Sequence, residues 1–348
     1  MKWLRLTVAQ NLGFVLATGM FVVLYAIYVS MHPSYTAAVV GQNANESFAL
    51  ILVSMAQTVP VLLGGIDLSV GPLMTMVNCF ASELVSGGST SIVLGLLACL
   101  AIGAVAGFLN GCLVVYGRIQ AIIATLATGA VFLGISLFLR PTPGGAIDED
   151  LAWALTNDVN ELGVTYGWWT DLGWLGRIPL PLVILLLIVV LVWRPFRRST
   201  VGRGCYAIGS AEGAAYMSGV RVDRSRLAAF TLGGFFAGCG GLYLALQTGS
   251  GNADLQQAGE YTLRSIAAVV IGGTSLYGGT GGVVGTIFGA LVLRAISFIF
   301  RVVPEGSPLG FVASPLLQPL FEGLILLLAV SLGAARVFRV RNRLSLFT

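Results

Sequence analysis

The chain has 348 residues, of which 56% are hydrophobic and 10% are charged, and its mean hydropathy is +0.90. Soluble domains carry about 25% charged residues, so the composition excludes an ordinary soluble protein and predicts an all-α, polytopic helical bundle in a membrane. The apolar runs are continuous and do not alternate with polar residues, which excludes an outer-membrane barrel.

The net charge is +4, and its distribution is more informative than its size. Lys and Arg occur near both ends of the chain and in residues 194–226, whereas residues 140–179 are acidic. The positive-inside rule therefore predicts that both termini and residues 194–226 are cytoplasmic and that residues 140–179 are external. The Arg residues flank spans and form no face, so nucleic-acid binding is not expected.

We expect one transmembrane domain over residues 1–348, with residues 32–47 and 248–262 as external polar segments. A signal peptide is the alternative for the first apolar run, but Met31-His32-Pro33-Ser34 lacks a small-x-small cleavage site. The apolar runs predict about ten spans, near residues 11–31, 48–63, 70–86, 91–115, 120–139, 180–193, 227–247, 263–271, 283–303 and 313–333.

The segment Gly64-Gly65-Ile66-Asp67-Leu68-Ser69-Val70-Gly71 interrupts one apolar stretch. A carboxylate at membrane depth is by default a functional-site candidate, and glycines there let the backbone leave the helix. Ser69 suits the N-cap of a new helix that begins at Val70, and Asp67 would lie near the positive end of that helix. The segment therefore predicts a helix, a break and a second helix.

A related pattern occurs late in the chain, in Gly272-Gly273-Thr274-Ser275-Leu276-Tyr277-Gly278-Gly279. It matches the first segment at the two leading Gly, at the Leu and at the final Gly, and it also follows an apolar run. Paired Gly-interrupted segments are typical of transporters built from repeats. The alternative is two unrelated packing turns between helices.

Within residues 194–226, Gly209 to Gly219 predict one short helix. Ser210 suits its N-cap, Glu212 its N-terminal end and Gly219 its C′ position. The alternative to a docking role is a surface helix that only links two spans. Small or adaptable side chains suit a docking surface, and this helix has them at Ala211, Ala214, Ala215 and Met217.

Two isolated features have two interpretations each, and two others have one. Arg294 and Glu322 either pair inside the bundle or reach an interface by snorkelling. The four Trp of residues 140–179 either anchor at the headgroup interface or form a platform for an external partner. Gly103, Gly107 and Gly111 form a stripe for close helix packing. A single His and five Cys without a C-x-x-C pair predict neither a metal site nor a hydrolase centre.

The segment Gly64 to Gly71 resembles the Gly-Gly-Ile-Asp-Leu-Ser-Val-Gly signature of the ribose/simple-sugar permeases of bacterial ABC importers. Val201 to Gly209, followed by Ala211 to Val220, is similar to the coupling segment of that family, and Ala268 to Gly285 resembles its late Gly-rich motif. The resemblance spans about residues 48–333, and residues 140–179 fall outside its motifs.

The resemblance implies a permease subunit of the bacterial inner membrane, and no enzyme. It would pair with an identical or homologous permease, with a cytoplasmic ATP-binding subunit and with a periplasmic sugar-binding protein. The chain has no G-x-x-x-x-G-K-[ST] motif, so ATP and Mg²⁺ would be used by the partner ATPase and this chain would bind no cofactor. The ATPase-coupling candidates are Ser210, Ala211, Glu212, Ala214, Ala215, Met217 and Gly219.

A sugar has to pass through and not stay bound, so we expect a path with shallow polarity. Asp67 either lines this path or, as we expect, holds the break through backbone N–H bonds. An ion- or proton-coupled secondary transporter that uses Asp67 is the alternative function. The candidates for the path or the helix breaks are Gln57, Gly64, Gly65, Asp67, Ser69, Asn78, Asn110, Gly272, Gly273 and Gln318.

Overall fold

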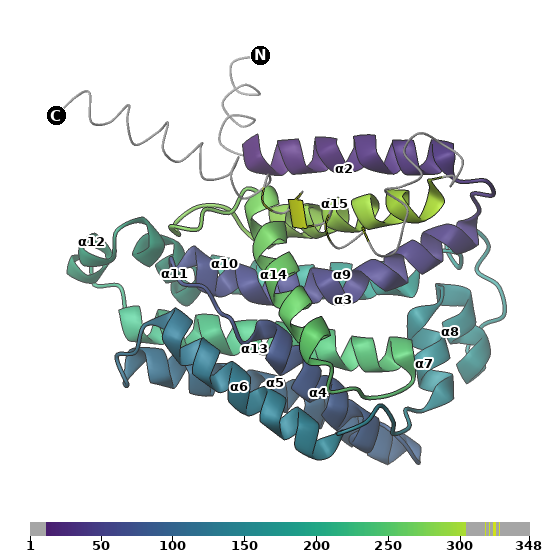
Figure 1. The fold of residues 1–348 in the computed structure, drawn as a ribbon, viewed down its shortest axis with the longest axis horizontal. Coiled ribbons are helices and arrows are strands. Elements are labelled where there is room, and N and C mark those ends of the chain that lie inside the picture. The colour runs from purple at the N-terminus through teal and green to yellow at the C-terminus, as the bar shows by residue number, and fades with distance from the viewer. Residues whose placement is uncertain (1–11, 304–316, 318–319, 321–322, 325–326, 328–348) are drawn as a thin grey trace.

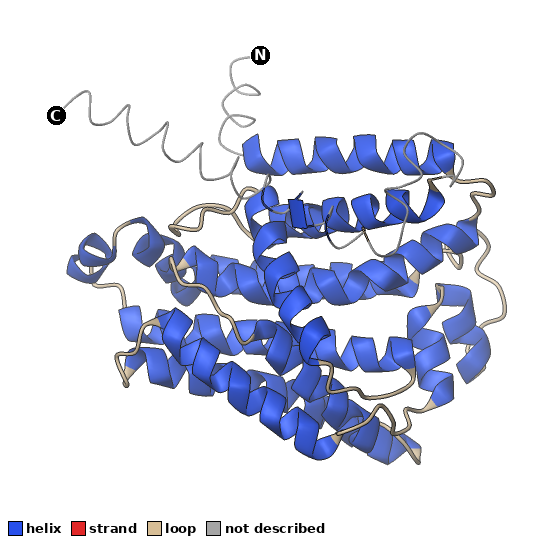
Figure 2. Cartoon of the chain, in the orientation of Figure 1, coloured by secondary structure: helices blue, strands red, loops and turns tan. Residues whose placement is uncertain are grey.

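The computed structural model describes residues 12–303 together with 317, 320, 323, 324 and 327, and the elements of this part are helices (Figures 1 and 2). Seven of the described helices are long and apolar enough to span a membrane. The composition-based prediction of a polytopic helical bundle is confirmed. The predicted count of ten is not matched, because two predicted spans are shorter helices and most of 313–333 lies outside the described residues.

The first half of the described chain contains α2 (Leu12–Met31), α3 (Ala37–Leu62), α4 (Val70–Leu84), α5 (Ser89–Val115), α6 (Ala121–Leu139), α7 (Glu149–Thr156) and α8 (Val159–Tyr166). One continuous helical stretch follows, made of α9 (Leu180–Ile188), the π-helical turn η1 (Val189–Trp193) and α10 (Arg194–Arg198). The remaining helices are α11 (Thr200–Ser210), α12 (Glu212–Met217), α13 (Val222–Thr248), α14 (Leu255–Ile271) and α15 (Val283–Val302).

Helix α3 is the centre of the bundle, and residues 47–62 of it are all buried. It packs against α13, α14 and α15, while α2 lies along α15 at one edge (Figure 1). Helices α5 and α13 pack closely, and a Cβ on Gly107 would clash with Phe230 O of α13. Gly234 of α13 faces Gly103 and Gly107 in the same way, so the predicted small-residue stripe packs a helix pair.

Helix α3 begins at Ala37, so the helix starts about eleven residues before the predicted span at residue 48 and includes the second part of residues 32–47. The polar side chains there have partners inside the bundle. Asn43 Nδ2 donates to the Tyr25 hydroxyl at 3.3 Å, and the Tyr243 hydroxyl donates to Asn45 Oδ1 at 2.7 Å. Because tertiary contacts satisfy these groups, the helix continues through sequence that looks like a loop.

Helix α14 begins at Leu255, earlier than the predicted residue 263. Asp254 is its N-cap and accepts a hydrogen bond from Gln257 N at 2.9 Å. The spacing of Asp254 and Gln257 is that of a capping box, and it was an available signal for the helix start. The helix therefore includes residues 255–262, which were expected to form a polar external segment without a helix.

Arg294 of α15 pairs with Glu46 of α3 at 2.7 Å, and Arg301 contacts the same carboxylate at 2.6 Å. The predicted partner Glu322 lies outside the described residues. The acceptor on α3 was not anticipated because residues 32–47 were expected to be outside the bundle. The pair joins α3 at the centre of the bundle to α15, the last long helix of the described residues.

The segments 140–179 and 194–226 lie at opposite ends of the bundle. Helices α7 and α8 form one end, and α11 and α12 form the other (Figure 1). Asp148 and Asp158 cap α7 and α8, accepting from Leu151 N at 2.8 Å and Glu161 N at 3.0 Å. The acidic segment is thus folded into two short helices, and the basic loop faces the other way.

Candidate functional site

The first helix break follows α3. Its Gly64 has φ +78°, in the left-handed region that glycine adopts without steric cost. Gly64 N donates to Val61 O at 2.9 Å and Gly65 N donates to Pro60 O at 3.1 Å. This is a Schellman C-cap, which ends the helix with its last carbonyls satisfied.

The second break follows α14 and has the same geometry. Gly273 has φ +82°, Gly273 N donates to Val270 O at 3.0 Å, and Thr274 N donates to Val269 O at 3.0 Å. Gly64 therefore corresponds to Gly273, one residue away from the sequence match that paired Gly64 with Gly272. Both breaks therefore end a helix in the same way, but this cap is common, so the choice between a structural repeat and two unrelated turns stays a prediction.

The two breaks touch each other. Gly279 N donates to Leu62 O at 3.0 Å, and a Cβ on Gly64 would lie 3.1 Å from Tyr277 O. These contacts tie the end of α3 to the loop that precedes α15. Helix breaks more than two hundred positions apart in the sequence thus form one unit in the structure.

Helix α11 ends against this unit. A Cβ on Gly209 would clash with Leu62 O and Gly279 N, so only glycine allows the approach. The Tyr206 hydroxyl donates to Gly281 O at 3.0 Å, a second link between α11 and the late break. The basic loop is therefore in direct contact with both interruptions of the helices.

Asp67 lies in the first break, with 2% of its surface exposed. Its Oδ1 accepts hydrogen bonds from Ser69 N at 2.8 Å and from Ser69 Oγ at 2.6 Å. In the amide orientation that satisfies both groups, Gln57 Nε2 donates to Asp67 O at 2.7 Å and Asp67 N donates to Gln57 Oε1 at 3.2 Å. Side chain and main chain of Asp67 are both fixed.

Two further helices contribute to this group of polar residues. Asn110 Nδ2 of α5 donates to Ser69 Oγ at 2.8 Å, and Thr125 Oγ1 of α6 accepts from Leu68 N at 2.9 Å. Asn110 Oδ1 is buried and has no hydrogen-bond partner among the described residues. We call Gln57, Asp67, Ser69, Asn110 and Thr125 the polar node. It joins α3, α5 and α6 to the start of α4.

Helix α4 begins at Val70, as predicted, but the Ser69 side chain does not cap it. Ser69 Oγ is already engaged with Asp67 and Asn110, which leaves its backbone carbonyl to accept from Leu73 N at 2.7 Å. Ser69 therefore occupies the N-cap position, as predicted, but its side chain makes no capping hydrogen bond because it is used in the polar node.

The remaining path candidates lie elsewhere. Asn78 Oδ1 accepts from Asn252 N at 2.8 Å, and its Nδ2 donates to Ser250 O at 3.4 Å. Asn78 thus ties α4 to the turn before α14 and does not join the polar node. Gln318 lies outside the described residues.

Each break also lines a pocket. Gly64 and Gly65 border a volume of about 640 Å³ that Arg118, Asp223 and Arg226 also line. Gly272 and Gly273 border a second volume, of about 730 Å³, together with Trp193, Arg197 and Tyr206. Both pockets combine apolar walls with charged or hydroxyl groups from the end of the bundle that carries α11 and α12.

The predicted single helix over Gly209 to Gly219 is two helices. Ser210 ends α11, and its Oγ donates to Tyr206 O at 2.9 Å, so Ser210 is not the N-cap. Ala211 occupies the N-cap position of α12 without a side-chain bond. The prediction failed because the extended backbone at Ala211 interrupts the helix. Gly219 has φ +80° at C′, as predicted, and Val220 N donates to Ala215 O at 3.0 Å.

Helix α12 is the tip of this end of the bundle (Figure 1). Met217 is 89% exposed and Tyr216 is 73% exposed, whereas Ala215 faces inward at 5%. Ala214 is exposed, and Glu212 pairs with Arg226 of α13 at 2.7 Å. Sequence reasoning missed Tyr216 and Tyr206. The position of Tyr216 within an Ala-rich helix was an available signal for the first of them.

The fold and the paired breaks define a membrane permease with an exposed loop helix at one end. The chain belongs to the family described as branched-chain amino acid transport system / permease component, which it matches over residues 39–330. No solved structure matches the chain.

Three curated relatives indicate how the chain compares with named proteins. It is 33% identical to the ribose import permease protein RbsC of Bacillus subtilis strain 168, over 93% of each chain. It is 34% identical to the autoinducer 2 import system permease protein LsrC of Enterobacter sp. strain 638, over 79% of this chain and 76% of the relative. It is 28% identical to the D-allose transport system permease protein AlsC of Escherichia coli K12, over 79% and 80%.

Proposed function

We propose that this chain is the permease subunit of an ATP-driven importer of sugars or sugar-like solutes in the bacterial inner membrane. It works with an identical or homologous permease, a cytoplasmic ATP-binding subunit and a periplasmic sugar-binding protein. ATP and Mg²⁺ are used by the ATP-binding subunit. Both termini and residues 194–226 face the cytoplasm. The names of the relatives, which import ribose, autoinducer 2 and D-allose, support the substrate class.

The observation that carries the proposal is the link from α12 to the helix breaks. The tip of α12 presents Tyr216 and Met217 to solvent, and α11 behind it touches both breaks through Gly209 and Tyr206. A partner that binds α12 and moves it would therefore displace the ends of α3 and the loop before α15. Movement of a packed element between two arrangements is the usual physical basis of such coupling.

The contacts of Asp67 favour its structural role over that of an ion site. Its carboxylate is buried and already accepts two hydrogen bonds from Ser69. An ion-coupled transporter would instead require this acid to exchange with water or a cation. Transport that survives loss of ATP but not collapse of the ion gradient would support the secondary transporter and contradict our proposal.

The proposal is tested by purifying the tagged chain from its own cells in a mild detergent and identifying the proteins that accompany it. We expect an ATP-binding subunit. A second, different permease would indicate a heteromeric pore. If this chain is the only permease found beside the ATPase, the pore is a homodimer. A preparation that transports without any ATPase would contradict the proposal.

Ala214→Arg tests the docking surface directly. A bulky charge on the exposed face of α12 should abolish uptake and solute-stimulated ATP hydrolysis while membrane insertion stays normal. The matched control is Thr90→Arg, an exposed position at the start of α5 at the opposite end of the bundle and outside residues 140–179, which should retain activity. Unchanged uptake in Ala214→Arg would show that α12 does not couple to the ATPase.

A further inference from the structure

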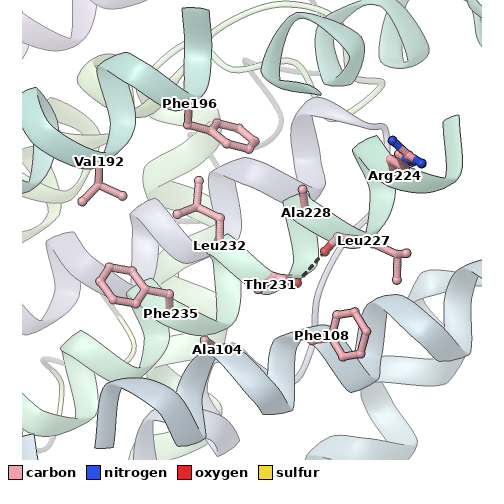
Figure 3. A pocket seen from close by; sticks show the side chains of 10 residues that line it. All are labelled: Ala104, Phe108, Val192, Phe196, Arg224, Leu227, Ala228, Thr231, Leu232 and Phe235. Carbon is pink, nitrogen blue, oxygen red and sulfur yellow. Dashed lines mark hydrogen bonds between the residues drawn. The ribbon is translucent and has the colours of Figure 1, made fainter. Parts of the chain in front are cut away.

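An apolar groove runs along the outside of the bundle between α5, α13 and the η1–α10 stretch (Figure 3). It has a volume of about 600 Å³, within the range of ligand sites. On α13 its wall is one helical stripe, formed by Arg224, Leu227, Ala228, Thr231, Leu232 and Phe235. These positions recur at intervals of three and four residues, so they share one face of the helix.

The opposite walls are aromatic and the base is small. Phe108 of α5 and Phe196 of α10 flank the stripe, and Ala104 leaves space beneath it (Figure 3). Thr231 Oγ1 donates to Leu227 O of its own helix at 2.8 Å, so the one hydroxyl in the stripe needs no partner from a ligand. The groove therefore suits a flexible hydrocarbon.

Arg224 lies at one end of the stripe (Figure 3). Its side chain is exposed and has no ion pair or hydrogen bond among the described residues. Arg224 also lines a second pocket of about 470 Å³, together with Arg221, Thr200 and Ser218. Arg224 therefore borders both the apolar groove and a small pocket lined by basic and hydroxyl groups.

The dimensions match one leaflet of a membrane. At 1.5 Å per residue, the stripe from Arg224 to Phe235 is about 16 Å long. The hydrocarbon core of a bilayer is about 30 Å thick, so one leaflet contributes about 15 Å. Arg224 would then lie at headgroup level and Phe235 near the middle of the bilayer.

We propose that this groove binds one anionic phospholipid, with an acyl chain along the α13 stripe and its phosphate at Arg224 and Arg221. A neighbouring permease would have to bury the Arg224 guanidinium, which is costly without a counter-charge. The headgroup pocket includes Ser218 and Gly219 at the end of α12. The lipid therefore lies beside α12, the helix to which we assign ATPase coupling, and its binding would influence the movement of that helix. This effect on coupling rests on the proposed function, whereas the lipid site itself does not.

The test is native mass spectrometry of the purified chain in detergent, titrated with phosphatidylglycerol or phosphatidylcholine. We expect Arg224→Ala to weaken phosphatidylglycerol binding about fivefold, because the headgroup loses one of its Arg contacts. The control is Arg203→Ala, which removes an equally exposed Arg of the same loop outside both pockets and should change affinity less than about twofold.

A second pair of variants tests the acyl-chain groove. Ala104→Trp fills the groove and should weaken binding about tenfold, because the chain loses its apolar contacts. Ala127→Trp places the same side chain on an exposed position of α6, a helix that does not line the groove, and should bind as the parent does. Normal yield and thermal stability of all four variants establish that folding is intact.

Three results would overturn the proposal. Phosphatidylglycerol binding that is unchanged in Ala104→Trp would exclude the groove. Glycerol phosphate bound as tightly as the lipid would indicate a free-phosphate site. A loss of dimer in Ala104→Trp with lipid binding intact would show that a second copy covers the groove. The assay needs neither ATP nor a solute, so its result is separate from the test of the importer.

Discussion

At the scale of single residues, the polar node explains why a carboxylate is buried in an apolar chain. Asp67 accepts two hydrogen bonds from Ser69, and its main chain is bonded to Gln57. Each of these groups would be costly to bury without a partner. The node therefore fixes the geometry between α3 and α4 and leaves little freedom for Asp67 to exchange with solvent.

Substitution of Asp67 separates a structural from a direct role. Asp67→Asn keeps an acceptor for Ser69 N, and we expect it to cost about 1 kcal/mol and to retain part of the uptake. Asp67→Leu leaves the Ser69 donors unpaired, and we expect a loss of about 2–5 kcal/mol with failed assembly. Thermal unfolding in detergent and uptake measure both. An Asp67→Asn protein that is fully stable but inactive would indicate a direct role.

The Glu46 carboxylate makes a second prediction at this scale. It neutralises Arg294, whose side chain is only 13% exposed, and Arg301, which is 50% exposed. Glu46→Leu leaves the Arg294 charge buried without a partner and should destabilise the fold by about 3 kcal/mol. Glu46→Leu/Arg294→Leu should recover most of this loss. The check is a double-mutant cycle of unfolding free energies, and additive losses would contradict the assigned pair.

At the scale of elements, the two helix breaks have the same geometry. Each ends a buried helix with a Schellman cap at Gly64 or Gly273, and each borders a pocket at the end of the bundle with α11 and α12. The hydrogen bond from Gly279 N to Leu62 O links the two breaks directly, so a displacement of one would strain its contact with the other. Helix α11 contacts both breaks through Gly209 and Tyr206, so a movement of α11 would act on both.

Alanine substitution tests the capping geometry. A side chain at positive φ costs about 1–2 kcal/mol, so Gly64→Ala should destabilise by about that amount. Gly273→Ala should cost more, because its Cβ would also clash with the backbone of Gly13 in α2. Gly134→Ala is the control, since it lies in the middle of α6 with nothing within 4 Å of the added atom and should be neutral or slightly stabilising. Equal unfolding temperatures for all three variants would contradict the assigned caps.

At the scale of the whole molecule, the bundle has two different ends. One carries α7 and α8 with their acidic caps, and the other carries the Arg-rich loop and α12 (Figure 1). Among the described residues, the long helices run between these ends, and α3 is enclosed by its neighbours (Figure 1). A force applied at α12 thus enters the molecule at the end where both helix breaks meet.

The opposite placement of the two ends predicts opposite labelling. In intact cells, a membrane-impermeant thiol reagent should react with Trp174→Cys in the acidic segment and not with Met217→Cys on α12, because the loop is expected to be cytoplasmic. Both native side chains are more than three-quarters exposed, at 77% and 89%. The parent chain, with its own Cys residues, is the control. The reverse pattern would invert the proposed orientation, and equal labelling would contradict a spanning bundle.

The sequence by itself determined the class of protein and the location of the first helix break. Continuous apolar runs require a helical membrane bundle, because only helices satisfy their own backbone groups in lipid. Glycines and an acid inside such a run require an interruption, which the structure contains between Leu63 and Ser69. These conclusions depend on local composition and need no knowledge of neighbours.

Only the tertiary structure decided how those parts meet. The start of α3 at Ala37, the pairing of Arg294 with Glu46 and the diversion of Ser69 from its helix to Asp67 all depend on partners distant in the sequence. The two breaks contact each other, and α11 contacts both of them, through glycines. These glycines are required because a Cβ would prevent the close approach of the backbones. A pattern along the chain records which groups are polar or small, but not which other segment will satisfy or contact them.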